Sequence, residues 1–193
     1  DCDPQGNATT GLGVDRSALG GGLTDLMIGS TSPDEVILQT ELQSLHLIPA
    51  DVDLVGAEVE LISIPEKEFR LRKALAAITS RYDYIFLDCP PSLGFLTVNA
   101  LTAAGGVLVP LQCEYYALEG LSHLLDTIRA VRRSLNPTLR LMGILQTMSD
   151  VRNNLSQQVA REVRTHFGAD VFQTVIPRNV RLSEAPSHGK PIL

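Results

Sequence analysis

The chain has 193 residues, a formal charge of −6, and 44% apolar and 20% charged residues. This composition excludes a disordered or fibrous protein, and the acidic balance disfavours a surface that is basic all over while allowing a local basic patch. The longest apolar runs are far shorter than the roughly 20 residues that a membrane helix needs, so we expect no membrane association.

Apolar runs and helical spacings alternate along the chain from residue 45 onward. The run at 45–49 ends in a proline and predicts a short strand, and apolar stripes at 51–62 and 66–81 predict two helices. The segment 82–88 is nearly all hydrophobic and ends in an aspartate, which is typical of a strand covered on both faces. The pattern then predicts helices at 95–104, 118–135 and 154–167 and strands at 107–111, 139–148 and 171–176.

This alternation predicts βαβ units with right-handed crossovers, and therefore an α/β fold with a mostly parallel sheet and helices on both faces. No internal repeat, low-complexity tract or linker interrupts the sequence, so we expect one domain over residues 1–193. Both ends look cut: residues 1–4 read as the exit of a strand, and residues 190–193 restart an apolar run. We therefore expect a fragment that is truncated at both ends.

Carboxylates recur where predicted strands end. Asp1 and Asp3 follow one such point, and Asp88 follows the apolar residues 85–87. In open parallel sheets ligands bind outside the carboxyl ends of the strands, and carboxylates there suit Mg²⁺. An apolar run that ends in aspartate resembles a Walker B element. Alone, an apolar run that ends in aspartate more often marks an ordinary strand end. The same pattern of carboxylates at Asp1 and Asp3 favours a ligand-binding site.

No G-x-x-x-x-G-K-[ST] motif occurs in the sequence. The glycine-rich segments at 11–13 and 20–22 have no following lysine, so they predict turns or mobile loops rather than a phosphate-binding loop. If the protein is a P-loop NTPase, we expect its phosphate-binding loop to lie before residue 1.

Three longer motifs resemble those of the ParA/Soj family of chromosome-partitioning ATPases, which are P-loop NTPases with a deviant Walker A box. They lie at 1–9 (DCDPQGNAT), at 88–94 (DCPPSLG) and at 176–191 (IPRNVRLSEAPSHGKP), and the segment 147–156 also resembles the family. The last motif favours the chromosomal Soj branch over the division-site regulator MinD. The family's first strand and its P-loop are missing from this chain.

The resemblance implies a weak ATPase that uses ATP and Mg²⁺ and forms an ATP-dependent homodimer. It implies that this dimer binds DNA non-specifically and is released when a ParB-type centromere-binding partner stimulates hydrolysis. The implied location is the cytoplasm, on the nucleoid. Because the P-loop is missing, we expect residues 1–193 alone to be inactive.

The resemblance also implies roles for individual residues. Asp3 matches the carboxylate that positions or activates the attacking water, and Asp1 matches its catalytic neighbour near the metal. Asp88 matches the Walker B aspartate and, with Asp3, would hold Mg²⁺. Physically, phosphoryl transfer needs a positioned water and neutralised charge more than covalent chemistry.

Pro177, Asn179 and Met148 fall in the motifs that contact the nucleotide base. A proline ring gives a packing edge, and an amide offers a donor and an acceptor to the edge of adenine. Without the resemblance, Pro177 could be interpreted as a residue that ends a strand, and Asn179 as a residue of a turn. For DNA we favour Arg152 and Arg181, which lie in family loops.

Other interpretations remain open at this level. The arginines at 129–133 form a second basic cluster, which the helix dipole also explains. A MinD-like membrane-associated ATPase and a non-catalytic scaffold are alternative functions, and the presence of all three aspartates opposes the scaffold. We expect Cys2, Cys89 and Cys113 to be small buried residues in a reducing compartment rather than ligands of an iron–sulfur cluster.

Overall fold

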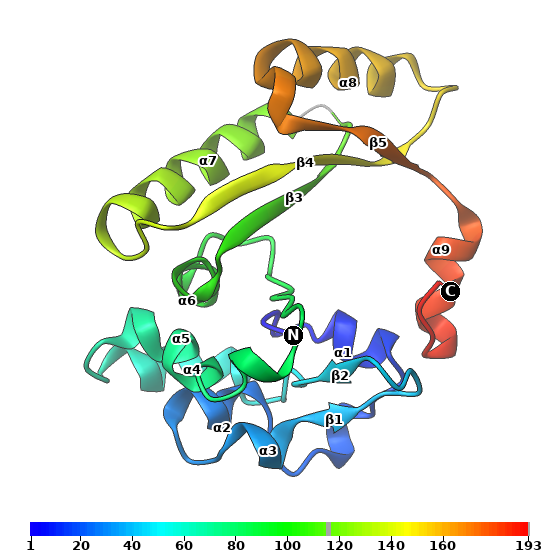
Figure 1. Ribbon diagram of the computed structural model, residues 1–193. Helices are drawn as coiled ribbons and strands as arrows, with labels where there is room; N and C mark the ends of the chain where they lie inside the picture. The colour runs from blue at the N-terminus through cyan, green and yellow to red at the C-terminus, as the bar shows by residue number, and fades with distance from the viewer. Residues whose placement is uncertain (115–116, 193) are drawn as a thin grey trace. The chain divides into compact units, whose positions relative to one another are not determined.

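The computed structural model in Figure 1 describes residues 1–114 and 117–192, with the side chain of Glu58 excepted. The chain divides into two compact units, which we take separately. The first comprises Asp1–Ala104 together with the C-terminal residues from Glu184 onward, and the second comprises Gly105–Ser183.

The second unit is a three-stranded parallel sheet with two helices. Its strands β3 (Gly106–Gln112), β4 (Arg140–Ser149) and β5 (Val171–Pro177) lie in the order β3-β4-β5. Helix α7 (Ala117–Ser134) connects the first two strands, and α8 (Asn154–Phe167) with a short 3-10 turn connects the last two. Sequential strand order with right-handed crossovers places successive helices on the same face, and α7 and α8 do lie together on one face of this sheet. These five elements confirm the sequence-based predictions.

The core of the second unit lies between this sheet and its two helices. In β3, Val109 and Leu111 are buried while Leu108 and Pro110 are exposed, so the strand buries alternate side chains. The buried cluster is completed by residues of the neighbouring strands and helices, namely Cys113, Leu121, Ile144, Val159, Val163 and Val171.

Helix α8 has the bounds that the sequence predicts because both of its ends carry strong signals. The Asn153 Oδ1 atom accepts hydrogen bonds from the backbone N–H groups of Leu155 and Ser156, at 3.0 and 3.3 Å. At the other end Gly168 has φ +50°, a conformation that glycine adopts without the usual steric cost.

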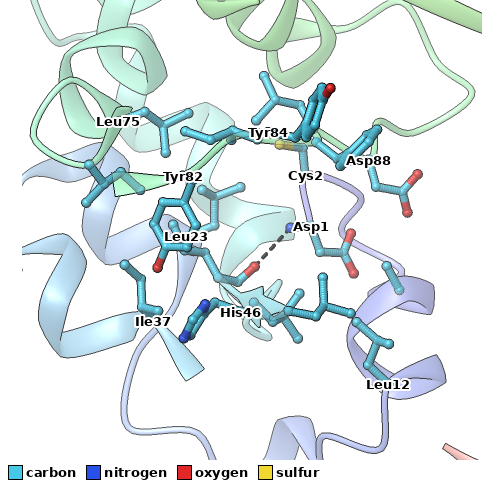
Figure 2. Close-up of a pocket in the computed structure, with 18 of the residues that line it drawn as sticks. Asp1, Cys2, Leu12, Leu23, Ile37, His46, Leu75, Tyr82, Tyr84 and Asp88 are labelled. Carbon is cyan, nitrogen blue, oxygen red and sulfur yellow. Dashed lines mark hydrogen bonds between the residues drawn. The ribbon is translucent and has the colours of Figure 1, made fainter. Parts of the chain in front are cut away.

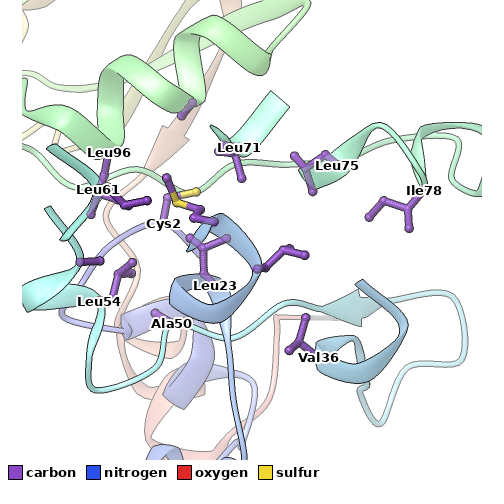
Figure 3. Packing of buried hydrophobic residues seen from close by; sticks show 14 residues of the cluster. Cys2, Leu23, Val36, Ala50, Leu54, Leu61, Leu71, Leu75, Ile78 and Leu96 are labelled. Carbon is purple, nitrogen blue, oxygen red and sulfur yellow. The ribbon is translucent and has the colours of Figure 1, made fainter. Parts of the chain in front are cut away.

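The first unit is built from short elements around its own core. Helices α2, α4, α5 and α6 surround that core, and Figure 3 shows Leu23, Leu54, Leu71 and Leu96 gathered in it around Cys2. The α-helices are α1 (Asn7–Gly11), α2 (Leu23–Ile28), α3 (Pro33–Val36), α4 (Leu54–Ile62), α5 (Arg70–Leu75) and α6 (Phe95–Ala103). Strands β1 (Leu38–Gln39) and β2 (His46–Leu47) pair antiparallel, and 3-10 turns lie at Arg16–Ala18, Lys67–Phe69 and Thr79–Arg81.

The C-terminal residues return to the glycine-rich segment of the first unit. After β5 the chain forms α9 (Val180–Glu184) and a 3-10 turn at Ala185–His188, which packs against α1. Gly13 (φ +83°) and Gly189 (φ +65°) meet backbone to backbone, and a Cβ atom on Gly189 would lie 2.7 Å from the Cα atom of Gly13. Side chains at both positions are therefore excluded, which explains the glycine at position 13 of the predicted turn at 11–13.

Three predicted elements of the first unit are wrong or shortened. The strand at 45–49 is only the two-residue β2. The predicted helix at 66–81 is divided into a 3-10 turn, α5 and a second 3-10 turn, and Glu66 has φ +53°, outside the right-handed helical region. At the start of α5, Arg70 donates to the carbonyl oxygens of Met27 and Ile28. The segment 82–88 forms no strand: within the described residues its only backbone-to-backbone hydrogen bond joins Cys2 N–H to Asp88 O at 2.7 Å.

Candidate functional site

Asp1 organises the first motif through its carboxylate. The Oδ2 atom accepts hydrogen bonds from Thr9 N–H and Thr9 Oγ1–H, each at 2.9 Å, and Oδ1 accepts from Asp3 N–H at 3.0 Å. The Asp1 amino group donates to the carbonyl oxygen of Ile48 at 2.9 Å, as Figure 2 shows. Both carboxylate oxygens thus already accept protein hydrogen bonds, which is the arrangement of a residue that holds a loop.

Asp3 stands differently in the same loop. Its Oδ1 accepts from Gln5 N–H at 2.9 Å in a local turn, and its carbonyl oxygen accepts from Gly6 N–H at 2.8 Å. Within the described part of the chain no donor reaches Oδ2, and the side chain is half-buried. Asp3 therefore presents one carboxylate oxygen that can accept a hydrogen bond from a water or face a cation.

Arg16 fixes this loop from outside the motif. Its guanidinium donates to the carbonyl oxygens of Pro4 (2.8 Å), Gln5 (2.7 Å), Ala50 (2.8 Å) and Asp51 (2.8 Å). Five N–H donors in a rigid fork suit one side chain to this set of acceptors. Sequence reasoning missed Arg16, because its partners are backbone atoms that no residue pattern marks.

The carboxylate of Asp51 stabilises the start of α2. Its carboxylate accepts from Thr24 N–H (2.8 Å), Thr24 Oγ1–H (2.6 Å) and Asp53 N–H (3.0 Å). It thereby caps the first turn of α2, where the N-cap residue Gly22 has no side chain to do so. The N-cap residue of α4 is Asp53, and its side chain makes no capping hydrogen bond.

The second motif meets the first at Asp88. Its carbonyl oxygen accepts from Cys2 N–H, and its side chain is exposed.

Burial raises the pKa of the Cys2 thiol, and burial together with the nearby Cys2 and Asp88 raises the pKa of Cys89 to about 12. Both thiols are therefore protonated at neutral pH. The predicted burial of Cys2 and Cys113 is confirmed, and Cys89 is half-buried.

An apolar cavity of about 230 Å³ lies beside Asp1 and Cys2 (Figure 2). Its walls include Leu12, Ile37 and Tyr82, and Asp1 and Asp88 are the only carboxylates among the residues that line it. Among the described residues that line it there is no lysine or arginine.

The described residues contain no group of three or more histidine, cysteine or acidic side chains that could hold a metal ion. Mg²⁺ does not require such a cage, because it takes one or two carboxylates and completes its shell with water and substrate phosphates. The Oδ2 atom of Asp3 and the exposed carboxylate of Asp88 have the chemistry for this. The residues present therefore fit the ion.

The predicted base-contacting residues gather at the carboxyl ends of β4 and β5 in the second unit. Ser149 pairs with Pro177, and Arg178 N–H donates to Ser149 O at 2.9 Å. Met148, just before this contact, has φ +53°, a value uncommon outside glycine. Asn179 Oδ1 accepts from Arg181 N–H at 2.9 Å at the start of α9. The amide oxygen of Asn179 is thus used within the protein, as its interpretation as a turn residue predicts.

Arg152 lies in the turn that follows β4, and Arg181 lies in α9, which follows β5. Both side chains are exposed, and neither forms an ion pair with any acidic residue that the structure describes. In the alternative cluster, Arg129 is paired with Asp126 at 2.8 Å on the surface of α7. Arg152 and Arg181, like Arg132 and Arg133 of the alternative cluster, are therefore exposed cations without an acidic partner among the described residues.

Comparison with known proteins agrees with this picture. A family model described as an AAA domain matches residues 1–141. Over its whole length the chain is 53% identical to the sporulation initiation inhibitor protein Soj of Bacillus subtilis and 54% identical to the chromosome partitioning protein ParA of Myxococcus xanthus. It covers 76% and 68% of these two proteins.

Solved structures share the fold. A crystal structure described as cobyrinic acid a,c-diamide synthase from Mycobacterium smegmatis, with bound ATP analogue and magnesium, has a TM-score of 0.87 and 40% identity over 93% of this chain and 71% of that one. The ATP complex of a Cyanothece McdA variant has a TM-score of 0.90 over 99% of this chain and 75% of that one; at 19% identity it supports the fold alone. Every helix in the described ranges is too short or too polar to cross a membrane. The chain belongs to the ParA/Soj family of chromosome-partitioning ATPases.

Proposed function

We propose that this partitioning ATPase uses Asp3 to position the water that attacks the γ-phosphate of ATP. The observation that carries the proposal is the difference between the two aspartates of the first motif. Both Asp1 oxygens accept hydrogen bonds from the protein, whereas within the described residues Asp3 Oδ2 has no donor. Asp1 thus supports catalysis by holding the loop, and Asp3 acts on the water.

Mg²⁺ is held in this proposal by Asp3 and Asp88, with water and phosphate oxygens completing its shell. When bound, the ion neutralises charge on the transferring phosphoryl group. The magnesium and ATP analogue in the structure from M. smegmatis support Mg²⁺ and ATP as the bound groups.

The base-contacting role of Pro177, Asn179 and Met148 also stays a proposal. The Pro177 ring and the Met148 thioether give apolar contact, and the Asn179 amide NH₂ is its donor. Asn179 Oδ1 caps α9, so reading the base with the oxygen as well requires that the cap opens.

The cellular role follows from the family. We propose that an ATP-dependent homodimer binds DNA non-specifically through Arg152 and Arg181, on the nucleoid in the cytoplasm. A ParB-type centromere-binding protein stimulates hydrolysis and releases the dimer. The proposal treats residues 1–193 as part of one ParA-type ATPase domain.

The experiment uses an extended protein, in which the parts of the Bacillus subtilis relative that lie outside the match are joined to residues 1–193. We expect slow ATP hydrolysis by the extended protein and none by residues 1–193, which contain no G-x-x-x-x-G-K-[ST] motif. Asp3→Ala should abolish turnover while ATP binding, followed by a fluorescent analogue, is retained.

Asp25→Ala is the matched control, because this half-buried carboxylate lies in α2 outside both motifs. Unchanged hydrolysis by Asp3→Ala would remove Asp3 from the catalytic role. Robust hydrolysis by residues 1–193 would contradict the need for a phosphate-binding loop.

A further inference from the structure

Arg16 holds the turn that carries Asp3. Residues 3–6 form this turn, which is closed by a hydrogen bond of 2.8 Å from Gly6 N–H to Asp3 O. Both carbonyl oxygens inside the turn accept from Arg16: its Nη2 atom donates to Pro4 O at 2.8 Å, and its Nη1 atom donates to Gln5 O at 2.7 Å. Arg16 thus fixes the peptide groups on both sides of Gln5.

One rigid peptide group connects Arg16 to the Asp3 carboxylate. The peptide between Pro4 and Gln5 is planar, so the direction of its C=O bond sets the direction of its N–H bond. Arg16 binds the oxygen of this group, and the N–H of the same group donates to Asp3 Oδ1 at 2.9 Å. By holding Pro4 O, Arg16 therefore aims the Gln5 N–H at Oδ1 and leaves Oδ2 as the oxygen without a donor among the described residues.

The same guanidinium is anchored on a buried segment of the first unit. Its Nε atom donates to Ala50 O and its Nη2 atom to Asp51 O, each at 2.8 Å. Ala50 is fully buried, and the buried Asp51 carboxylate is bound in turn to Thr24. Arg16 therefore places the Asp3 turn relative to a segment that is itself held in place.

Little else holds the two central residues of the turn. Gln5 is exposed and Pro4 is half-buried, and among the described residues Arg16 is the only donor to either carbonyl oxygen. Hydrogen bonds from a charged donor are stronger than those between neutral groups. Without Arg16 both oxygens return to water, and the turn loses the contacts that orient its peptide groups.

We propose that Arg16 is a positioning residue for ATP hydrolysis, which keeps Asp3 in the orientation in which Oδ2 meets the attacking water. The inference rests on the proposed role of Asp3 and adds a residue that lies outside both motifs. A displacement of about 1 Å in a reacting group can slow a reaction about a hundredfold. Loss of the Arg16 contact therefore lowers the rate of the chemical step rather than the affinity for ATP.

The test measures kcat and KM for ATP hydrolysis by the extended protein. We expect Arg16→Ala to lower kcat about tenfold to a hundredfold, while KM and the binding of a fluorescent ATP analogue stay unchanged. Free guanidinium, at concentrations that do not unfold the protein, should restore part of kcat in this variant. Arg16→Lys keeps the charge but not the planar fork, so its kcat should be intermediate, and it supplies the same comparison if Arg16→Ala fails to fold.

Arg70→Ala is the matched control. The Arg70 guanidinium also binds backbone oxygens of the first unit, those of Met27 and Ile28 at the end of α2, and it donates to neither motif in the described structure. Urea denaturation measures the stability of each variant. We expect both alanine variants to lose stability, but only Arg16→Ala to lose kcat and to respond to guanidinium.

Three outcomes would overturn the inference. If Asp3→Ala abolishes hydrolysis but Arg16→Ala keeps the wild-type kcat, Arg16 does not position Asp3, and the proposed function stands. If Arg70→Ala lowers kcat as much as Arg16→Ala does, both substitutions act through stability. If Asp3→Ala hydrolyses ATP at the wild-type rate, the proposed role of Asp3 fails, and positioning through Asp3 fails with it.

Discussion

Thr9 and Asp1 are joined by two hydrogen bonds of 2.9 Å, from the N–H and the O–H of Thr9 to the same oxygen of Asp1. The Thr9 hydroxyl also accepts from Ala50 N–H at 3.0 Å, and the threonine side chain is fully buried. One side chain therefore connects the first motif to the segment before α4.

Replacing Thr9 should weaken this connection. Thr9→Val keeps the shape but leaves a carboxylate oxygen and a buried N–H without their hydroxyl partner, so we expect a loss of about 1–3 kcal/mol in the free energy of unfolding. Urea denaturation of the extended protein measures it. Thr9→Ser keeps the hydroxyl and should lose less, and equal losses in both variants would assign the effect to the methyl group.

Gly6 and Arg16 should be energetically coupled. Gly6 has φ +67°, and a Cβ atom there would lie 2.6 Å from the Arg16 guanidinium. Gly6→Ala should therefore cost about 1–2 kcal/mol from backbone strain, plus the displacement of Arg16. Arg16→Lys should also destabilise, because an ammonium group cannot reach four carbonyl oxygens at once.

A double-mutant cycle separates these terms. In Gly6→Ala/Arg16→Ala the clash is gone, so the combined loss of unfolding free energy should be smaller than the sum of the single losses. Additive losses would show that the new methyl group does not press on Arg16.

The Cys89 thiol should make stability depend on pH in the alkaline range. Its pKa in the folded protein is raised from 9.0 to about 12, chiefly by burial. Since the unfolded thiol ionises first, the contribution of Cys89 is complete below pH 9 and is lost as pH rises toward 12.

The measurement is the difference in unfolding free energy between wild type and Cys89→Ala as a function of pH. We expect the wild type to lose stability more steeply above about pH 9, because other titrating groups are common to both proteins. Parallel profiles would contradict a thiol that is kept neutral by burial.

How far the sequence predicts the fold differs between the two units. In the second unit each element has a full period and clear ends, as with Asn153 and Gly168 at the ends of α8, so local signals agree with packing. In the first unit, contacts between distant residues decide. Arg70, at the start of α5, binds carbonyl oxygens at the end of α2, and the apolar segment 82–88 pairs with no strand in the described structure.

The candidate site was likewise predictable where sequence motifs mark it and not where contacts between distant residues decide it. The motifs placed Asp1, Asp3 and Asp88 in two loops that do meet, through Cys2 N–H and Asp88 O. The sequence could not show that Asp1 and Asp3 differ in their hydrogen bonds, since both are aspartates in one motif. The contribution of Arg16 was also hidden, because its side chain binds backbone oxygens of residues up to 35 positions away.

The DNA-binding role of Arg152 and Arg181 can be tested by charge reversal in the extended protein. Both side chains are exposed and follow neighbouring strands of the second unit, Arg152 in the turn after β4 and Arg181 in α9, and a symmetric dimer would present the pair twice. Because each neutralised phosphate releases counterions, binding should fall steeply as salt rises. Arg181→Glu should weaken DNA retention strongly at every salt concentration and lower the salt slope, with ATP-dependent dimerisation intact.

The matched control is Arg132→Glu, which reverses the same charge in the last turn of α7. DNA retention is measured against salt, with and without ATP, for wild type and for the Arg152, Arg181 and Arg132 variants. Retention that Arg152→Glu and Arg181→Glu leave unchanged but Arg132→Glu abolishes would move the DNA surface to the end of α7. Retention that does not depend on ATP would contradict the dimer switch, because one subunit would then supply enough phosphate contacts by itself.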